Sequence, residues 1–241
     1  MGIAPNLVFI SGASSGIGLS VAEAVPFEAR VIDISRSGAP GFEHFEADLC
    51  DPASWAAVGA LFEREMNGYA GERVVFVHSA GTLHPMGFAG EVDAKGYTAQ
   101  VLLNSAAPQV LGDAFLRSAH RCKARCQLLM IGSGAALTVY RGWSAYCGGK
   151  AAVDHWVQTV GAELDYRGSP TRVASVAPGV VETAMQEQIR EVSERDFPDL
   201  PRFVELYEQG QLRDPAEVAQ DLWRLLESGL ANGSVLDLRD A

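Results

Sequence analysis

The chain has 241 residues, of which 48% are hydrophobic, and its formal net charge at pH 7 is −11. This length and this apolar content predict one domain, residues 1–241, with one substantial core. The acidic balance argues against a nucleic-acid partner, because phosphate backbones are bound by clustered Lys and Arg side chains. No apolar run approaches the roughly 18 residues of a membrane span and no signal peptide is recognisable, so we expect a cytoplasmic protein without a membrane partner.

Short apolar runs alternate along the chain with segments in which apolar residues recur at helical spacing. This alternation predicts an α/β fold with a doubly wound parallel sheet of about seven strands and helices on both faces. The expected strands are 7–10, 29–34, 44–47, 74–77, 128–131, 172–176 and 235–238. The expected helices are 19–25, 51–66, 93–120, 143–165 and 214–226. Residues 180–210 depart from clean alternation, which is typical of a lid over a substrate, with ordinary surface helices as the alternative.

A glycine-rich turn follows the first predicted strand, with the sequence Ser11-Gly12-Ala13-Ser14-Ser15-Gly16-Ile17-Gly18. A strand, such a turn and a helix amino terminus form a phosphate site, because glycines let the backbone approach and the helix dipole favours anions. The spacing Gly-x-x-x-Gly-x-Gly differs from the Gly-x-Gly-x-x-Gly form of other dinucleotide sites. Its place after the first strand of the chain favours a nucleotide site over a simple tight turn.

The end of the second predicted strand carries Ser35 and Arg36. In nucleotide folds an acid at this strand end binds the adenosine ribose hydroxyls, whereas an arginine accommodates a 2′-phosphate. Ser35 stands where the acid would be, and Arg36 follows it, which favours NADP(H) as the cofactor. Asp33 lies two positions too early for the ribose contact, and we interpret it as structural.

Tyr146 and Lys150 lie four residues apart in the predicted helix 143–165, so both side chains leave the same helix face. A free phenol has a pKa of about 10, and work near neutrality needs roughly 4 kcal/mol of help. An ammonium group at about 4 Å supplies that much at an effective dielectric near 20. Ser133, just after strand 128–131, would hold a carbonyl oxygen. The trio suits proton transfer to a carbonyl as hydride arrives, although Tyr-x-x-x-Lys alone is also an ordinary amphipathic helix face.

Together, these two stretches resemble the short-chain dehydrogenase/reductase family, and the resemblance covers essentially the whole chain. It implies a Rossmann-type domain that binds NAD(P) at the glycine turn. It also implies a catalytic set, namely Asn104, Ser133, Tyr146 and Lys150. Residues 141–143 and 177–186 are most similar to the branch that contains sepiapterin reductase and the bacterial benzil reductases.

Asn104 matches the family position that links the lysine to solvent through a water molecule. Pro108 has no backbone N–H to return to the Asn104 carbonyl, so the carbonyl is free to hold that water. We therefore expect Asn104 to be the proton-relay residue, and a simple helix kink is the alternative.

The resemblance also implies the cofactor contacts. Asp48 and Leu49 match an adenine-contacting pair, and Val181 and Thr183 match positions that contact the nicotinamide amide and the pyrophosphate. The expected cofactor-binding residues are Gly12, Ser14, Ser15, Gly16, Ile17, Gly18, Ser35, Arg36, Asp48, Leu49, Ala80, Gly81, Tyr146, Lys150, Pro178, Gly179, Val181 and Thr183. The chain departs from the family in two places: Ser15 replaces a basic residue of many NADPH-dependent members, and His78 replaces a structural asparagine.

The substrate is expected to be a small molecule with a carbonyl group. The expected substrate-binding residues are Ser133, Trp143, Tyr146, Met185, Gln186 and Asp237. Trp143, Met185 and Gln186 would make a pocket that suits aromatic groups. Asp237 matches the carboxylate that anchors the pterin ring in sepiapterin reductase, or it is a solvent-facing strand acid.

We therefore expect an NADPH-dependent carbonyl reductase that acts on a 1,2-diketone such as benzil, or on a pterin side-chain ketone. The alternatives are a reductase of a sugar, steroid or acyl-thioester ketone, and a cofactor-sensing protein without chemistry. The family resemblance implies a homodimer, or a tetramer, assembled through helices 93–120 and 143–165. The apolar contacts expected there are Phe115, Leu116, Trp156 and Val160. The cysteines, Cys50, Cys122, Cys126 and Cys147, are expected to be isolated thiols and not metal ligands.

Overall fold

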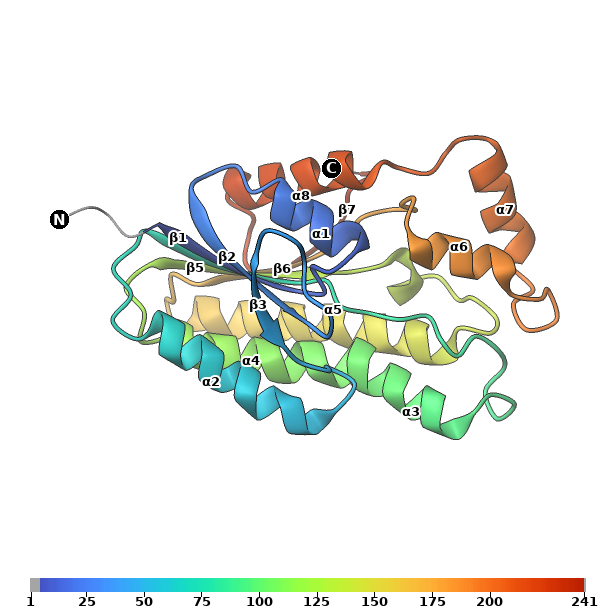
Figure 1. Cartoon of the computed structure of the whole chain (residues 1–241), viewed down its shortest axis with the longest axis horizontal. Helices are drawn as coiled ribbons and strands as arrows, with labels where there is room; N and C mark the ends of the chain where they lie inside the picture. Colours follow the sequence, from blue (N-terminus) through green and yellow to red (C-terminus); the bar gives the residue numbers. More distant parts are fainter. Residues whose placement is uncertain (1–4, 241) are drawn as a thin grey trace.

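A computed structural model describes residues 5–240 and shows one parallel sheet of seven strands in the order β3-β2-β1-β4-β5-β6-β7 (Figure 1). The predicted doubly wound α/β fold is thus confirmed. The strands are β1 (Asn6–Ser11), β2 (Ala29–Ser35), β3 (Glu43–Glu46), β4 (Arg73–His78), β5 (Arg125–Ile131), β6 (Arg172–Ala177) and β7 (Ser234–Asp237). The order reverses between β1 and β4, and a crevice forms at such a switch point beyond the carboxyl ends of the strands.

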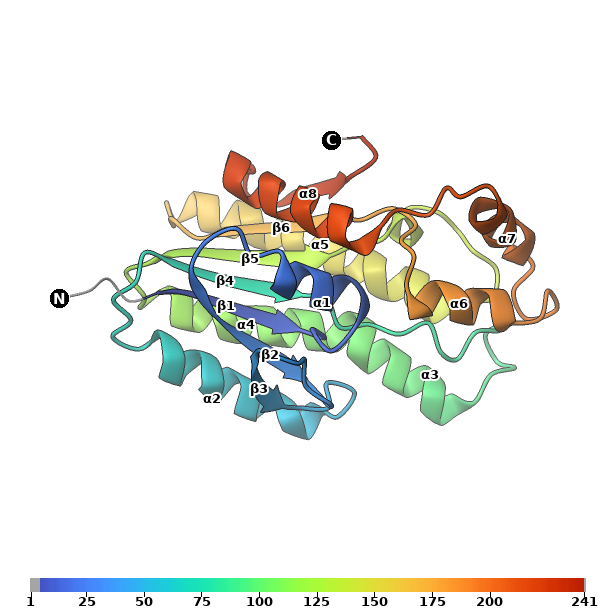
Figure 2. The ribbon, with the colours of Figure 1, turned by 45° about the horizontal axis from the view of Figure 1, so that its top comes forward.

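Helices cover both faces of this sheet (Figure 2). One face carries α1 (Gly16–Glu23) and α8 (Pro215–Ser228), and the indole of Trp223 donates to the Val21 carbonyl at 2.9 Å to join them. The other face carries α2 (Trp55–Met66), α4 (Ala107–Ala119) and α5 (Ser144–Tyr166). Alternate residues of each strand enter one or the other core, because strand side chains point to opposite faces in turn.

The predicted long helix 93–120 is divided into three parts. After α3 (Ala94–Val101) comes a π-helical turn, η2 (Leu102–Ala106), which leads into α4. Within this turn Ala107 donates its N–H to the Leu102 carbonyl, five residues back. The wider turn lies where Pro108 lacks the N–H that a regular helix would return to Asn104.

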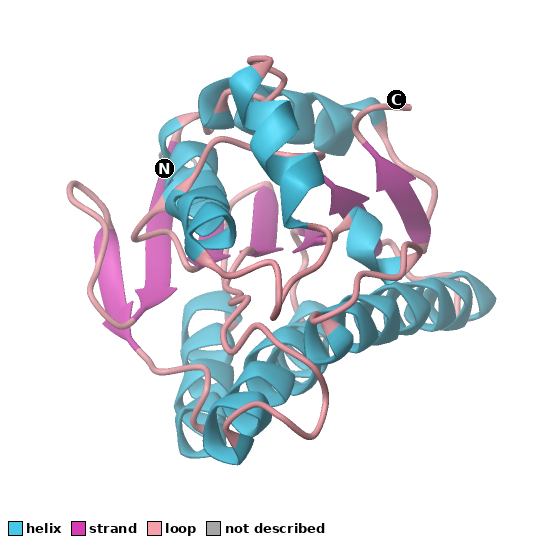
Figure 3. Cartoon of the chain, turned by 90° about the vertical axis from the view of Figure 1, so that its right-hand side faces the viewer, coloured by secondary structure: helices cyan, strands magenta, loops and turns pink. Residues whose placement is uncertain are grey.

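The segment that breaks the strand and helix alternation forms two short helices, α6 (Ala184–Glu191) and α7 (Leu200–Glu208). Seen from the carboxyl-terminal side of the sheet, they lie in front of the strand ends (Figure 3). Phe197 and Phe203 from this segment pack on Trp143 at the start of α5. The segment therefore forms one wall of the space beyond the sheet.

Three of the four apolar residues expected at a dimer surface are buried in the core. Phe115 is 0% exposed and contacts the rings of Phe62 and Phe76, so the prediction that it meets a partner subunit is wrong. Leu116 and Val160 are also buried, because both helices turn these positions toward the sheet. Periodicity alone could not separate a second apolar face from the core face.

None of the described helices combines the length and the apolar character that a membrane crossing requires.

Candidate active site

A cavity of about 820 Å³ lies beyond the carboxyl ends of the strands. Of the residues expected in the catalytic, cofactor and substrate sites, those that line it are Gly12, Ser14, Ser15, Gly16, Ile17, Ser35, Arg36, Asp48, Leu49, Ala80, Gly81, Ser133, Trp143, Tyr146, Lys150, Pro178, Gly179, Val181, Thr183, Met185 and Gln186. Gly18, Asn104 and Asp237 do not line it. The fold thus brings residues from far apart in the chain to one space, which is the usual place for ligands in this architecture.

The glycine turn is held by a buried carboxylate. Asp33 accepts the backbone N–H of Ala13 at 3.1 Å and the hydroxyl of Ser35 at 2.7 Å, so it fastens the turn to the end of β2. Gly12 has φ +73°, and a Cβ there would lie 2.9 Å from the Ala80 backbone. Asp33 therefore has the structural position that the sequence suggested.

The first turn of α1 fits a phosphate group. Its N-cap residue, Ser15, makes no side-chain hydrogen bond to the helix, so no side chain satisfies the first backbone N–H groups. Ser15, Gly16 and Ile17 line the cavity there. A pyrophosphate would find amide donors and the positive end of the helix dipole at this place.

Gly18 has a different position from the one expected. It is buried in α1, and a Cβ there would collide with the Gly12 carbonyl. A glycine is needed at this place in the motif because the helix packs closely on the turn. The residues before Gly18 line the cavity instead.

The other end of the cavity suits a charged nucleotide group. Arg36 is exposed and lines the cavity with Ser35, Asp48 and Leu49. No carboxylate pairs with Arg36 among the described residues, so its five N–H donors are available for a phosphate.

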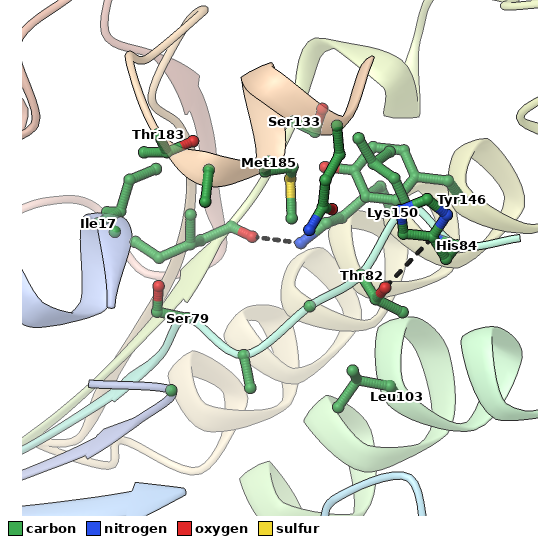
Figure 4. Close-up of a pocket in the computed structure, with 18 of the residues that line it drawn as sticks. Ile17, Ser79, Thr82, His84, Leu103, Ser133, Tyr146, Lys150, Thr183 and Met185 are labelled. Atoms are coloured by element: carbon green, nitrogen blue, oxygen red, sulfur yellow. Dashed lines mark hydrogen bonds between the residues drawn. The ribbon is translucent and has the colours of Figure 1, made fainter. Parts of the chain in front are cut away.

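Lys150 lies inside the protein and not at its surface. Its Nζ donates to the Ile131 carbonyl at 2.7 Å and lies 5.8 Å from the centroid of the Tyr146 ring. Burial lowers the pKa of Lys150 to about 8, and the nearby carboxylate of Asp154 opposes this shift. Ser133, Tyr146 and Lys150 come together from the end of β5 and from α5 (Figure 4).

Burial has the largest effect on the pKa of Tyr146. Burial raises the pKa of the Tyr146 phenol, and the Ser133 hydroxyl, which can hydrogen-bond to the phenolate, opposes the rise. The sequence predicts that the Lys150 cation lowers this pKa. In the structure burial is the largest cause of the shift, and the Lys150 charge is not among its causes.

Asn104 lies behind the cavity and is tied to its wall. Its side chain donates to the Thr82 carbonyl at 2.7 Å and accepts the Thr82 N–H at 3.0 Å. Gly149 of α5 packs on it, since a Cβ at Gly149 would lie 3.1 Å from the Asn104 Cβ. The pair of hydrogen bonds fixes the loop after β4 against the π-helical turn, next to the helix that carries Tyr146 and Lys150.

His78 ends β4 and is buried. Ser11 accepts the N–H groups of Ser79 and Ala80 at 3.2 and 3.3 Å, which leaves its hydroxyl proton for His78 Nδ1 at 2.9 Å. The ring proton of the neutral imidazole is therefore assigned to Nε2, which has no partner among the described residues. Burial, and then the Lys150 charge, lower the pKa of His78 to about 3.

This burial makes His78 a source of acid sensitivity. Between its folded pKa of about 3 and its unfolded value of 6.5, only the unfolded chain binds the proton, so stability falls as the pH decreases below 6.5. At pH 4.5 the loss reaches up to about 3 kcal/mol, at about 1.4 kcal/mol per pH unit. We expect the His78→Asn variant to lack this loss, so that its free energy of unfolding, measured in urea, falls less between pH 6.5 and pH 4.5. His155 is exposed, and the matched variant His155→Asn should leave the pH dependence of the free energy of unfolding unchanged. The same pH dependence in the original protein and in both variants would contradict the assignment.

The substrate half of the cavity has an aromatic wall. Trp143 stacks on Phe197 with ring centroids 4.4 Å apart and an interplanar angle of 7°. Tyr140 and Phe203 complete the wall, and both line the cavity. Tyr140 was missed in the sequence, although it lies only six residues before Tyr146.

Two other lining residues were also missed. Thr82 directly follows the Ala80-Gly81 pair, and His84 lies two residues further on. The backbone N–H of His84 donates to the Thr82 hydroxyl at 3.2 Å (Figure 4). Their position after a strand end was a signal, because the carboxyl ends of all the strands meet at the cavity.

Asp237 is not presented to the cavity as a free carboxylate. Arg239 binds it in a bidentate manner, with Nε to Oδ1 at 2.8 Å and Nη2 to Oδ2 at 2.6 Å. This ion pair lowers the pKa of Asp237 below its usual range. Arg239, two residues further on, lines the cavity in its place. The structure thus does not bring Asp237 together with the other expected substrate residues.

Among residues 5–240, no group of three or more His, Cys, Asp or Glu side chains is placed to hold a metal ion.

Comparison with known proteins gives one consistent family. The family model described as short chain dehydrogenase matches residues 6–194. A benzil reductase, (S)-benzoin forming, of Bacillus subtilis (strain 168) is 32% identical over 98% of this chain and 99% of its own length. Sepiapterin reductase of Meriones unguiculatus is 38% identical, over 46% of this chain and 40% of its own. A solved short chain dehydrogenase/reductase of Saccharomyces cerevisiae has a TM-score of 0.82 at 25% identity, covering 98% of this chain and 96% of that one.

Proposed function

The chain belongs to the short chain dehydrogenase family, and we propose that it is an NADPH-dependent reductase of 1,2-diketones. As a member of this family it is an oxidoreductase that acts on CH–OH and C=O groups, with a nicotinamide cofactor. We further propose that the cofactor carries a 2′-phosphate, that the substrate is a diketone and that one tyrosine donates the proton.

We propose that Tyr146 is the general acid of the reduction. The observation that carries this proposal is the burial of the Lys150 ammonium 5.8 Å from the Tyr146 ring, at the wall of the cavity. A phenol at that place can give its proton to a substrate carbonyl oxygen, and the nearby cation stabilises the phenolate that remains. The Ser133 hydroxyl would hold the same carbonyl oxygen.

We propose that Asn104 belongs to the proton relay that reprotonates Tyr146 after each turnover. Its backbone lies in the π-helical turn against Gly149, one residue before Lys150. A carbonyl group freed from helical bonding at this place can hold a water molecule that links the lysine to solvent.

The residues at the nucleotide end fit NADPH. Ser15, Gly16 and Ile17 would bind the pyrophosphate at the start of α1, and Arg36 would bind the 2′-phosphate. Asp48 and Leu49 would contact the adenine, while Val181 and Thr183 would hold the nicotinamide end. When bound, NADPH supplies the hydride that Tyr146 complements with a proton.

A benzil-like diketone suits the substrate half. The Bacillus subtilis relative is named for the reduction of benzil, and the wall of Trp143, Phe203 and Tyr140 offers aromatic surface for phenyl rings. Met185, which packs against the same aromatic cluster, and the buried Gln186 also line the cavity. A pterin ketone is less favoured, because Arg239 already occupies both oxygens of the carboxylate at Asp237.

Turnover of benzil tests the proposed function directly. Purified protein mixed with NADPH and benzil is expected to consume NADPH and to form benzoin, measured by absorbance and by chromatography. If no NADPH is consumed with benzil, other 1,2-diketones or sepiapterin, the proposed substrate class is wrong.

Replacing Arg36 tests the cofactor preference. We expect Arg36→Gln to raise KM for NADPH about tenfold, because one charge-assisted contact to an exposed phosphate is lost. KM for NADH should stay unchanged, since NADH lacks that phosphate. Arg117→Gln is the control, because Arg117 lies on α4, pairs with Asp113 and does not line the cavity. An equal effect of Arg36→Gln on NADH and NADPH would contradict the role.

We also propose that the protein forms a homodimer through α4 and α5. Since Phe115 is buried, the exposed apolar residues on these helices are Val110 and Tyr166. Sedimentation at micromolar concentration distinguishes a dimer, a tetramer and a monomer.

A further inference from the structure

Most charged groups on the cavity wall are cations, although the whole chain carries −11. Arg36 and Asp48 lie at the nucleotide end, and Lys150 lies beside the reacting phenol. Two further cations, Arg202 and Arg239, line the cavity, and among the described residues Asp48 is the only acid that lines it. A neutral diketone has no need of two guanidinium groups.

Arg239 presents part of its guanidinium to the cavity. Two of its five N–H donors, on Nε and Nη2, are used by Asp237. The side chain is still 53% exposed, and a Cβ at Gly134 would lie 3.5 Å from Nη2. Arg239 therefore lies next to the residue that follows Ser133, with three N–H donors left for a ligand.

Arg202 reaches the same region from α7. Its Nη1 donates to the Tyr140 hydroxyl at 3.1 Å, and its Cζ is 5.8 Å from the Tyr140 ring centroid. Asp199, the N-cap residue of the same helix, is paired with Arg141 at 3.1 Å. Arg202 has no carboxylate within 4.0 Å among residues 5–240, so it is a cation without a paired anion.

Tyr140 and the two arginines line the same cavity. Arg202 donates to the Tyr140 hydroxyl, and Arg239 lies beside Gly134, the residue after Ser133. The pKa of Arg239 is raised mainly by Asp237, and the charges of Asp240 and Tyr140 add to the rise. An aryl group stacked on the aromatic wall would carry a ring substituent toward these guanidinium groups.

We propose that Arg202, Arg239 and Tyr140 form an anion subsite and that the preferred substrates are aryl ketones bearing a carboxylate on the ring. The inference rests on the proposed carbonyl reduction and names its substrate class. A carboxylate on an aryl ring matches the planar guanidinium group, which binds carboxylates through paired N–H···O bonds. Asp237 moderates the subsite, because it neutralises part of the Arg239 charge.

A matched pair of diketones tests the proposal. We expect kcat/KM for para-carboxybenzil to exceed that for para-methylbenzil about three- to tenfold at low ionic strength. The ratio should fall toward one in high salt, since exposed charges are screened. A ratio near one at low salt, unchanged by salt, would overturn the proposal.

Variants that remove either a positive or a negative charge test the subsite further. Arg239→Gln and Arg202→Gln should each lower the ratio, while Asp237→Asn should raise it, because the Arg239 charge is then no longer neutralised. Arg117→Gln should leave the ratio unchanged. If Asp237→Asn lowers the ratio as much as Arg239→Gln does, the ion pair is only structural and the subsite is absent.

A binding measurement separates this inference from the proposed function. Quenching of tryptophan fluorescence reports the binding of para-carboxybenzoin and para-methylbenzoin to the protein with NADP⁺. If neither diketone is reduced, the proposed function fails, but tighter salt-sensitive binding of the carboxylate still supports the subsite. If both diketones are reduced equally and both benzoins bind equally, the subsite fails and the reductase remains.

Discussion

The Tyr146→Phe variant is expected to lower kcat for benzil about 10³-fold and to leave the Kd for NADPH unchanged. A general acid contributes roughly 10²- to 10⁴-fold, and Phe removes the only proton that this ring can give. The ring itself remains, so its packing against Trp143 at 5.6 Å is kept. Steady-state rates and fluorescence titration of NADPH measure the two quantities.

The matched control is Tyr166→Phe. Tyr166 lies at the end of the same helix, α5, and is 93% exposed, so the same chemical change there should alter neither kcat nor Kd. If Tyr146→Phe keeps kcat within a few-fold of the original, another group donates the proton. A cofactor sensor without chemistry would show no turnover in any of the three proteins.

The Phe62→Ala variant is expected to lower the free energy of unfolding by about 3–5 kcal/mol. Phe62 is fully buried on α2, and its ring lies 5.0 Å from those of Phe9 and Phe76 and 5.7 Å from that of Phe115. The substitution leaves a cavity at the centre of these contacts, because strands and helices on every side prevent collapse. Urea unfolding followed by circular dichroism measures the loss.

Phe88→Ala is the comparison for this substitution. Phe88 is 38% exposed and lies outside the core clusters, so we expect its loss to cost under about 1 kcal/mol. Phe62 does not line the cavity, so the folded variant should keep its KM for NADPH. Equal destabilisation by the two substitutions would show that the aromatic cluster is not a centre of stability.

Local patterns in the sequence were sufficient for the framework of this protein. Six of the seven strands lie within one residue of their expected ranges, and β5 begins three residues earlier than expected, at Arg125. All except β3, which has the sequence Glu-His-Phe-Glu, are mainly apolar runs. The glycine turn and the strand ends at Ser35 and Ser133 could be placed, because parallel strands bring their carboxyl ends to one edge. Helical spacing placed Tyr146 and Lys150 on one helix face, and the resemblance to the family gave the pair its expected role.

Other features depended on contacts between distant segments. Phe115 is apolar at helical spacing, but only its packing on α2 shows that it faces the core and not a partner. Gly18 belongs to the glycine motif by spacing, yet it packs on the Gly12 carbonyl instead of lining the cavity. Spacing identifies which residues share a face, and it leaves open what that face meets.

The sequence by itself determined the alternating strands and helices, the glycine turn and the Ser133, Tyr146 and Lys150 trio, because these depend on residue type and short-range geometry. Only the tertiary structure decided how the charged groups around them are paired. Lys150 donates to Ile131, Arg239 binds Asp237, and Arg202 has no carboxylate partner within residues 5–240. The physical reason is that desolvation and ion pairing act between groups that the chain brings together only when it is folded.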